Sequence, residues 1–178
     1  MKLPGKKILM IVAPESFRDE ELFVPRRLFE SLGAQVTVAS TRTGRARGML
    51  GGRATATRLI DHLRVDDFDA ILIVGGDGAQ EYLWPHNGLR ALVQQAAASE
   101  KVIGAICLAP VVLARAGLLE GGEAALWRCP ATLEELDRAG VRVADQDVLC
   151  AGRTITGSGP LVAERWAQAI AETVQTQK

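Results

Sequence analysis

The sequence of 178 residues lacks a net charge, has few histidines and contains no long apolar run. Lys plus Arg and Asp plus Glu are each 21, which argues against a nucleic-acid or anionic-membrane binder, because both need excess positive charge. No apolar stretch approaches the roughly 18 residues that a membrane helix requires. The two histidines, His62 and His86, are expected at the surface. No metal site is predicted, because no cluster has the spacing of zinc ligands.

Cysteine is also scarce, with only Cys107, Cys129 and Cys150. An odd number at wide spacings does not fit a secreted disulfide framework, so a cytoplasmic protein is expected. The basic N-terminus is followed by an apolar run, 8–13, that is short and soon meets acidic residues. This run is therefore interpreted as a first strand and not as a signal peptide.

The chain alternates strand-like and helix-like runs, with 48% apolar and 24% charged residues. Continuous apolar runs predict buried strands, and apolar positions at helical spacing predict helices. Strands are expected at 7–13, 35–40, 70–76, 102–107 and, with a hairpin turning near Ala151, within 141–157; helices are expected at 19–32, 84–99, 109–119, 131–140 and 160–175. The alternation predicts parallel pairing, and hence an α/β sandwich with one domain over residues 1–178.

Two segments carry additional signals. Ser16 or Asp19 is expected to cap the first helix, and Pro25 to kink it or open its first turns. Residues 41–58 hold five Arg, four Gly and no acid, which predicts a turn-rich excursion or a hairpin. Its arginines could bind phosphate or carboxylate, but a solvated or interface loop is the favoured interpretation.

Ligands of open parallel sheets bind beyond the carboxyl ends of the strands, and three candidate segments fall there. Cys107 lies between a buried strand and a helix start, where a side chain can project over the sheet edge and the helix N-terminus favours a thiolate. The alternative is that Cys107 is a buried apolar residue that only packs.

The other two segments are Gly75-Gly76 and the acidic stretch from Glu15 to Glu21. Backbone N–H groups at Gly75 and Gly76 could join that of Leu108 as oxyanion donors, or the glycines could only form a tight turn. Gly76-Asp77-Gly78 lacks the third glycine of a dinucleotide fingerprint, and no cofactor is predicted. Acidic residues of this stretch stabilise a helix N-terminus, which explains most of them. One of them could instead reach Cys107 if the first and fourth strands are neighbours. A useful pair of this carboxyl with the cysteine would need an unusual carboxyl pKa.

Taken together, four motifs resemble the ThiJ/PfpI superfamily, also called the DJ-one family, over nearly the whole chain. They are Asp-Glu-Glu-Leu-Phe-Val-Pro (19–25) after the opening strand, Ile-Val-Gly-Gly (73–76), Ala-Ile-Cys-Leu-Ala-Pro (105–110) and Gly-Ser-Gly-Pro (157–160). Each motif is weak alone, but their order and spacing are specific.

The resemblance implies a flavodoxin-like three-layer sandwich related to class I glutamine amidotransferases, and a homodimer or higher homo-oligomer. It implies a reactive Cys107 on a strained elbow, with Glu21 as its partner and the N–H groups of Gly76 and Leu108 as oxyanion donors. Members are described as intracellular proteases, cofactor-independent glyoxalases, deglycases and oxidation-sensing stress proteins.

Four positions depart from the family pattern. Leu108 stands where the protease-like members carry His, which argues against peptidase activity. Cys129 replaces the histidine that the parkinsonism-associated branch carries before a proline. Ser158 stands where Arg is common, and Arg18 where the protease-like branch has another glutamate.

Three hypotheses remain open from the sequence. The first is an enzyme in which Cys107 attacks a small reactive carbonyl while Glu21 moves the proton. The second is a redox or stress sensor that responds to an oxidant through Cys107, with Cys129 as a resolving thiol or only as apolar filling. The third is a binding module whose pocket has lost its histidines.

Overall fold

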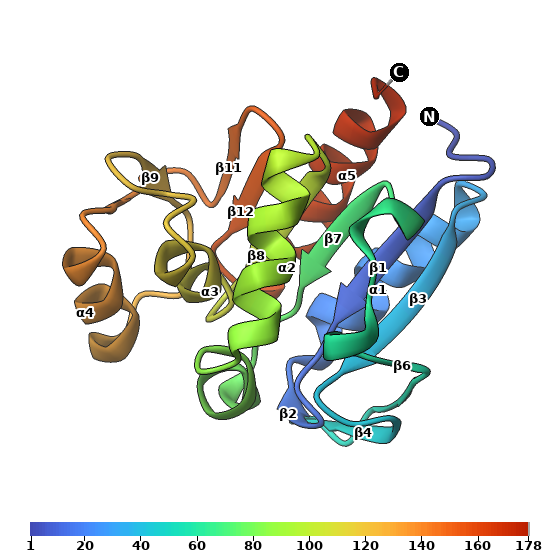
Figure 1. Cartoon of the computed structure of the whole chain (residues 1–178), viewed down its shortest axis with the longest axis horizontal. Helices are drawn as coiled ribbons and strands as arrows, with labels where there is room; N and C mark the ends of the chain where they lie inside the picture. Colours follow the sequence, from blue (N-terminus) through green and yellow to red (C-terminus); the bar gives the residue numbers. More distant parts are fainter. Residues whose placement is uncertain (178) are drawn as a thin grey trace.

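A seven-stranded sheet forms the centre of the computed structural model, which describes residues 1–177 (Figure 1). Its strands lie in the order β11-β12-β8-β7-β1-β3-β6, and all neighbours are parallel except the β11–β12 hairpin at one edge. The strands are β1 (Lys7–Ile11), β3 (Gln35–Ser40), β6 (Arg58–Leu59), β7 (Ala70–Ile73), β8 (Val102–Ile106), β11 (Val148–Ala151) and β12 (Thr154–Gly157). The predicted, mostly parallel sheet is confirmed.

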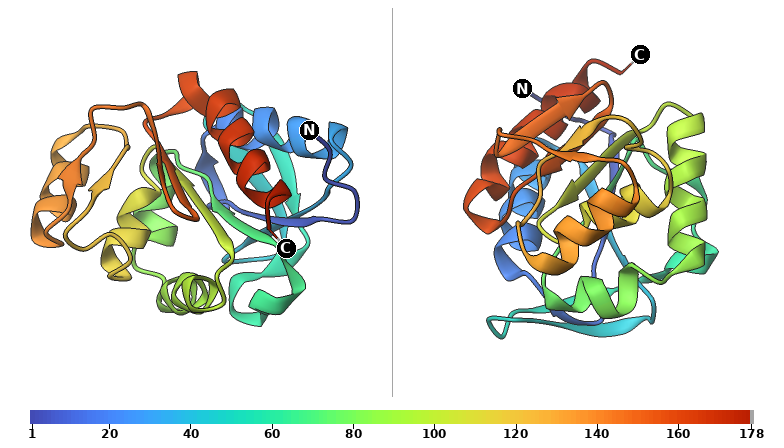
Figure 2. Two further views of the ribbon diagram at one scale, coloured as in Figure 1. Left: turned by 90° about the horizontal axis from the view of Figure 1, so that it is seen from above. Right: turned by 90° about the vertical axis from the view of Figure 1, so that its left-hand side faces the viewer.

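Helices cover both faces of this sheet and give the three layers seen in Figure 2. α1 and α5 pack together on one face, α2 lies on the other, and α3 contacts both α2 and α4. The helical segments are α1 (Asp19–Ser31), α2 (Asn87–Ala98), α3 (Pro110–Arg115), α4 (Pro130–Arg138), α5 (Ala163–Gln175), the 3₁₀ turns η1 (Ile60–His62), η2 (Val65–Asp67) and η4 (Pro160–Val162), and the π-helical turn η3 (Ala79–Leu83). The flavodoxin-like sandwich is confirmed. Among the helices of residues 1–177, none combines the length and apolarity that crossing a bilayer would take.

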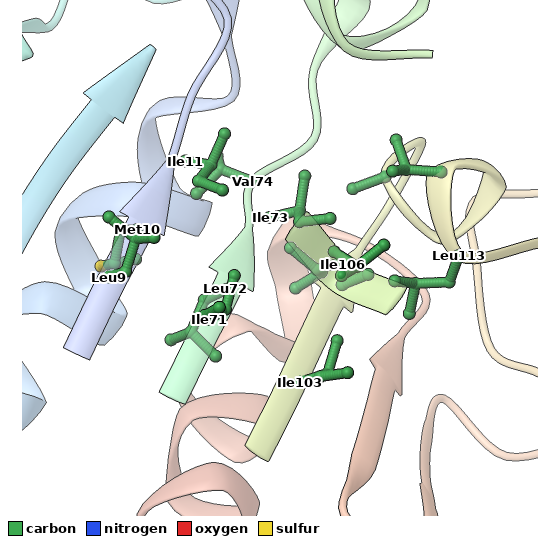
Figure 3. Packing of buried hydrophobic residues seen from close by; sticks show 14 of the residues in the cluster. Leu9, Met10, Ile11, Ile71, Leu72, Ile73, Val74, Ile103, Ile106 and Leu113 are labelled. Atoms are coloured by element: carbon green, nitrogen blue, oxygen red, sulfur yellow. The ribbon is translucent and has the colours of Figure 1, made fainter. Parts of the chain in front are cut away.

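The central strands are buried because helices cover both of their faces. Every residue of β7 and β8 is buried, which explains why these strands appear in the sequence as continuous apolar runs. Figure 3 shows Leu9, Leu72 and Ile106 within the apolar cluster that joins β1, β7 and β8. This packing fixes the relative positions of the strand ends that carry the candidate site.

A three-stranded sheet lies beside the main one and was only partly expected. β4 (Gly44–Gly48) and β5 (Arg53–Ala56) form an antiparallel hairpin, which confirms the hairpin interpretation of the Arg-rich segment. β2 (Glu15–Phe17) pairs with β4, although no strand was predicted there. Three residues are too few to show a strand periodicity, so this element depends on its partner.

The start of α1 differs from the sequence expectation. Arg18 is the N-cap residue, and no side chain caps the helix. Ser16 belongs to β2, and Asp19 accepts hydrogen bonds from the β4–β5 turn instead. Pro25 lies inside α1, which continues through it to Ser31.

The sheet order corrects two further expectations. β7 lies between β1 and β8, so the first and fourth predicted strands are not neighbours. The strand expected at the start of 141–157 is only β10 (Arg142–Val143), which pairs with β9 (Glu123–Ala124) outside the central sheet. Strands this short form only where tertiary contacts bring a partner alongside, so the pattern of apolar residues does not predict them.

Trp166 of α5 is a fully buried anchor between helix and sheet. Its Nε1 donates to the Ile155 carbonyl at 3.1 Å. Its ring lies over Gly104 of β8, where an added Cβ would come within 2.8 Å of ring atom Cζ2. One side chain therefore joins α5 to both β8 and β12.

Replacing Trp166 by alanine should lower the free energy of unfolding by about 3–5 kcal/mol, because the change opens a cavity. It also leaves the Ile155 carbonyl without its donor. Trp127→Ala is the matched control, since that side chain is 51% exposed and its loss should cost about 1 kcal/mol or less. Urea unfolding followed by circular dichroism measures both, and equal losses would contradict a core role for Trp166.

Candidate functional site

Three segments that are distant in sequence meet at the carboxyl edge of the central sheet. Cys107 follows β8 directly, and Gly75 and Gly76 lie just after β7. Glu21 lies in the first turn of α1, and its carboxyl group reaches the end of β7. There it accepts a hydrogen bond from the Gly75 N–H. The structure therefore brings together the residues that the sequence singled out, by a route different from the expected neighbouring strands.

Cys107 occupies a strained turn between β8 and α3. Its φ angle of 64° lies in the left-handed region, which costs a non-glycine residue about 1–3 kcal/mol. Its N–H donates to the Gly157 carbonyl at 2.9 Å, and its own carbonyl accepts from the Trp127 N–H at 2.9 Å. The carbonyl of Cys107 and the N–H of Leu108 belong to one trans peptide, so holding this carbonyl makes the Leu108 N–H point in the opposite direction. The Trp84 indole donates to the Leu108 carbonyl at 2.7 Å and fixes the next peptide.

Glu21 is a fully buried carboxyl group beside this turn. Its Oε2 accepts a hydrogen bond from the Gly75 N–H at 2.8 Å, whereas its buried Oε1 has no partner among the described residues. An added Cβ at Gly75 would lie 2.7 Å from Oε2 and 2.6 Å from the Cys107 Cβ, so only glycine fits there. The Gly75 N–H is thus already engaged, which corrects its expected place among the oxyanion donors.

The carboxyl and the thiol shift each other's pKa. Burial raises the pKa of Glu21 from 4.5 to about 7, which provides the unusual carboxyl that the sequence argument required. Burial, and after it the charge of Glu21, raise the pKa of the Cys107 thiol above its ordinary value. Hydrogen bonds from the backbone N–H groups of Gly76 and Leu108 to the sulfur oppose this increase.

The expectation of a thiolate favoured by a helix N-terminus is therefore wrong for the resting site. Helix α3 has only six residues, and the desolvation of Cys107 outweighs the nearby N–H groups. The buried carboxyl of Glu21 is the titratable group next to this thiol.

A cavity of about 350 Å³ opens beside the Cys107 sulfur. Its walls come from the start of α1, the loop after β7, the turn after β8, the β4–β5 turn and the segments before α4 and α5. The lining residues are Arg18, Met49, Gly76, Asp77, Gln80, Cys107, Leu108, Trp127, Cys129 and Pro160. This volume suits a small organic molecule next to the sulfur.

Cys129 lines the same cavity as Cys107. It is the N-cap residue of α4, and its sulfur lies 3.5 Å from the Thr132 hydroxyl oxygen. Within the described residues all three cysteines are free, and Cys150 is exposed on β11. The two cysteines at the cavity are thus separate thiols in this structure.

Histidine is absent from the cavity lining among residues 1–177. His62 is exposed, as expected. His86 is half-buried and not simply a surface residue, because its Nδ1 accepts from the Leu89 N–H and caps α2. The same described part of the chain holds no group of three His, Cys, Asp or Glu arranged for a metal ion.

Asp19 is a structural residue of the site that the sequence argument missed. Its carboxylate accepts from the N–H groups of Leu50 at 2.8 Å and Gly52 at 2.7 Å, and so holds the β4–β5 turn. An added Cβ at Gly48 or Gly52 would collide with this carboxylate. The turn carries Met49 into the cavity wall. The glycines on either side of Met49 indicate in the sequence that another group comes close to this turn. Only the fold shows that this group is the Asp19 carboxylate.

Comparisons with known proteins agree with this geometry. Residues 6–173 match the model of the DJ-1/PfpI family. An uncharacterized protein of Methanocaldococcus jannaschii is 46% identical over 89% of this chain and 77% of its own length. A deglycase of Pyrococcus horikoshii is 26% identical over 90% of this chain and 94% of its own. A glutathione-independent glyoxalase of Caenorhabditis elegans is 28% identical over 96% of this chain and 89% of its own.

A solved structure shares the whole architecture. The ThiJ/PfpI domain protein of Brachyspira murdochii superposes with a TM-score of 0.92 at 27% identity, covering 98% of this chain and all of its own. The family model spans nearly the whole sequence and includes the four motifs around the Cys107 site. The chain therefore belongs to the DJ-1/PfpI family.

Proposed function

We propose that this chain is a cysteine-dependent enzyme of the glyoxalase or deglycase type, which acts without a cofactor on small reactive carbonyl compounds. The observation that carries the proposal is the buried Glu21 carboxyl, coupled to Cys107 at the base of a cavity of about 350 Å³. Relatives named deglycase and glyoxalase support the same chemistry at 26–28% identity.

The proposed working state of the pair arises by moving one proton. When Glu21 ionises at a pH of about 7, its carboxylate becomes an acceptor for the thiol proton of Cys107. The transfer leaves a thiolate beside a neutral carboxyl, which removes the repulsion that raises the pKa of the thiol. The N–H groups of Gly76 and Leu108 then stabilise the thiolate.

The thiolate would add to the carbonyl carbon of the substrate. A C–S bond forms, the C=O double bond becomes a single bond, and the oxygen takes the proton from Glu21. The N–H groups of Gly76 and Leu108 are the proposed donors to this oxygen. Trp127 and Pro160 also line a second cavity of about 370 Å³, which offers space for the amine part of a glycation adduct.

Peptide hydrolysis is the less favoured reaction for this site. Leu108 stands beside the cysteine, and no histidine lines the cavity among the described residues. An amide needs a proton delivered to a poor leaving group, whereas addition to an aldehyde expels no group. The missing base therefore weakens peptidase chemistry more than carbonyl chemistry.

The proposal also covers the setting of the enzyme. We infer one domain, because a single apolar cluster extends from Leu3 to Val174. A reducing cytoplasm suits a site with two free thiols on one cavity. A homodimer or larger homo-oligomer is inferred from the family resemblance.

The alkylation rate of Cys107 should rise in two steps with pH. The first step is expected near pH 7, because ionised Glu21 then accepts the thiol proton, and the second at higher pH, where the thiol ionises without it. Glu21→Gln should remove the first step. Iodoacetamide labelling followed by peptide mass spectrometry measures this, with the exposed Cys150 as internal control. One identical step in both proteins would contradict the coupling.

Methylglyoxal turnover should depend on the pair. Cys107→Ser should abolish the loss of methylglyoxal, and Glu21→Gln should slow it by about 10²–10⁴-fold, the usual range for losing a general acid–base. Cys150→Ser is the matched control and should keep full activity, because that thiol is exposed and does not line the cavity. Retained turnover in Cys107→Ser would refute the proposed function.

A second candidate function is favoured by one observation, the presence of Cys107 and Cys129 on one cavity. A peroxide would oxidise the Cys107 thiolate to a sulfenic acid and be reduced to water or an alcohol. The Cys129 thiol would then attack the sulfenate sulfur, forming a disulfide and releasing water. In this function the chain is a redox sensor without a substrate.

Mild hydrogen peroxide should then produce a Cys107–Cys129 disulfide. Non-reducing peptide mass spectrometry should detect the linked peptides, and Cys129→Ser should instead accumulate sulfinate at Cys107. Cys150→Ser should leave the linkage intact. Sulfinate in the wild-type chain with no linked peptide would exclude Cys129 as a resolving thiol.

A further inference from the structure

Arg18 places a positive charge on the wall of the Cys107 cavity. The backbone N–H of Arg18 donates to the Gly75 carbonyl at 3.0 Å. An added Cβ at Gly76 would collide with the backbone nitrogen of Arg18. The residue is thus anchored against the loop whose Gly76 N–H faces the sulfur. Among the described residues that line this cavity, Arg18 is the only cation.

The guanidinium of Arg18 uses one edge and leaves another open. Nε donates to Glu20 Oε2 at 2.9 Å, and Nη2 donates to Glu20 Oε1 at 3.0 Å. A guanidinium has five N–H donors, and within residues 1–177 this one makes no further hydrogen bond. The edge formed by Nη1 and the second Nη2 proton can therefore bind a carboxylate through two parallel bonds.

Two carboxylates lie near this charge, and neither occupies the open edge of the guanidinium. Asp77 also lines the cavity, but it is exposed, so water screens it. Glu20 is 36% exposed and holds only the Nε side of the guanidinium. The pKa of Arg18 is raised by its hydrogen bonds to Glu20 and, further, by the charges of Glu21 and Cys107, so its field reaches the reacting pair.

We propose that Arg18 is a specificity-determining residue that makes the Cys107 site favour carbonyl compounds carrying a carboxylate next to the reacting carbon. This inference rests on the proposed function and names its substrate class: α-oxo acids with an aldehyde group, of which glyoxylate is the simplest probe, and their amine adducts. A neutral aldehyde such as glyoxal fills the same space without engaging the guanidinium.

The addition step needs no further reactant. The Cys107 sulfur forms a bond to the aldehyde carbon, and the C=O double bond becomes a C–O single bond. The thiol proton passes through Glu21 to the new oxygen, which gives a hemithioacetal. The carboxylate stays on the adjacent carbon, where Arg18 holds it throughout.

Alkylation of Cys107 by iodoacetate and iodoacetamide tests the inference without turnover. Next to the attacked carbon, iodoacetate carries a carboxylate and iodoacetamide carries a neutral amide. At each cysteine, the rate constant for iodoacetate is divided by that for iodoacetamide. The normalised ratio is this value at Cys107 divided by its value at the exposed Cys150, and it should be about ten in the wild-type chain. Arg18→Met should reduce it to about one, and Arg18→Lys should retain part of it.

Two further variants sharpen the test. Glu20→Gln should raise the normalised ratio, because it frees the second edge of the guanidinium. Arg42→Met is the matched control and should leave the ratio unchanged, since Arg42 pairs with Glu15 and does not line the cavity. A circular dichroism spectrum and a urea unfolding midpoint equal to those of the wild-type chain confirm that Arg18→Met has folded. An equal normalised ratio in wild type and Arg18→Met would overturn the inference.

Aldehyde protection gives an independent measurement. The glyoxylate concentration that half-protects Cys107 from iodoacetamide should rise about tenfold in Arg18→Met, and that of glyoxal should not change. A similar change for both aldehydes would overturn selectivity for the carboxylate. If methylglyoxal is not turned over, the proposed function fails while the labelling ratio still reports on Arg18. If turnover occurs and the ratio does not respond, only this inference fails.

Discussion

The burial of the Glu21 carboxyl is the constraint around which the site is organised. A pKa raised from 4.5 to about 7 corresponds to about 3 kcal/mol against the ionised group. One backbone donor, the Gly75 N–H, offsets part of this cost, and the second oxygen has no donor among the described residues. With a pKa of about 7, the carboxyl holds comparable neutral and ionised populations near neutral pH. This property is what the proposed role of Glu21, as proton carrier for the adjacent thiol, depends on.

The scaffold converts this local constraint into a fixed geometry. The close-packed ends of β7 and β8 set the distance between the glycine loop and the cysteine turn, because every residue of both strands is buried. Hydrogen bonds from Trp127 and Trp84 hold the carbonyls of Cys107 and Leu108. The left-handed conformation of Cys107 is maintained by these contacts and not by its own preference.

The family pattern and its departures describe different parts of the candidate site. The residues that the family resemblance singles out, Cys107, Glu21, Gly76 and Leu108, lie together at the sheet edge. Of the four departures, Arg18, Leu108 and Cys129 line the cavity, and Ser158 lines the neighbouring one. Because one fold can carry different sites, the proposed substrate preference is argued from these wall residues and not from the fold.

The sequence by itself determined the layers of the fold and the identity of the central residues. Apolar runs such as those of β7 and β8 reveal buried parallel strands, because burial on both faces leaves no polar position. Position after a strand was enough to select Cys107 and the glycines of 75–76. The tertiary structure alone decided that β7 separates β1 from β8, that Asp19 holds the β4–β5 turn, and that Gly75 bonds Glu21. It also decided the direction of the Cys107 pKa, since desolvation depends on everything packed around a group and no local pattern records it.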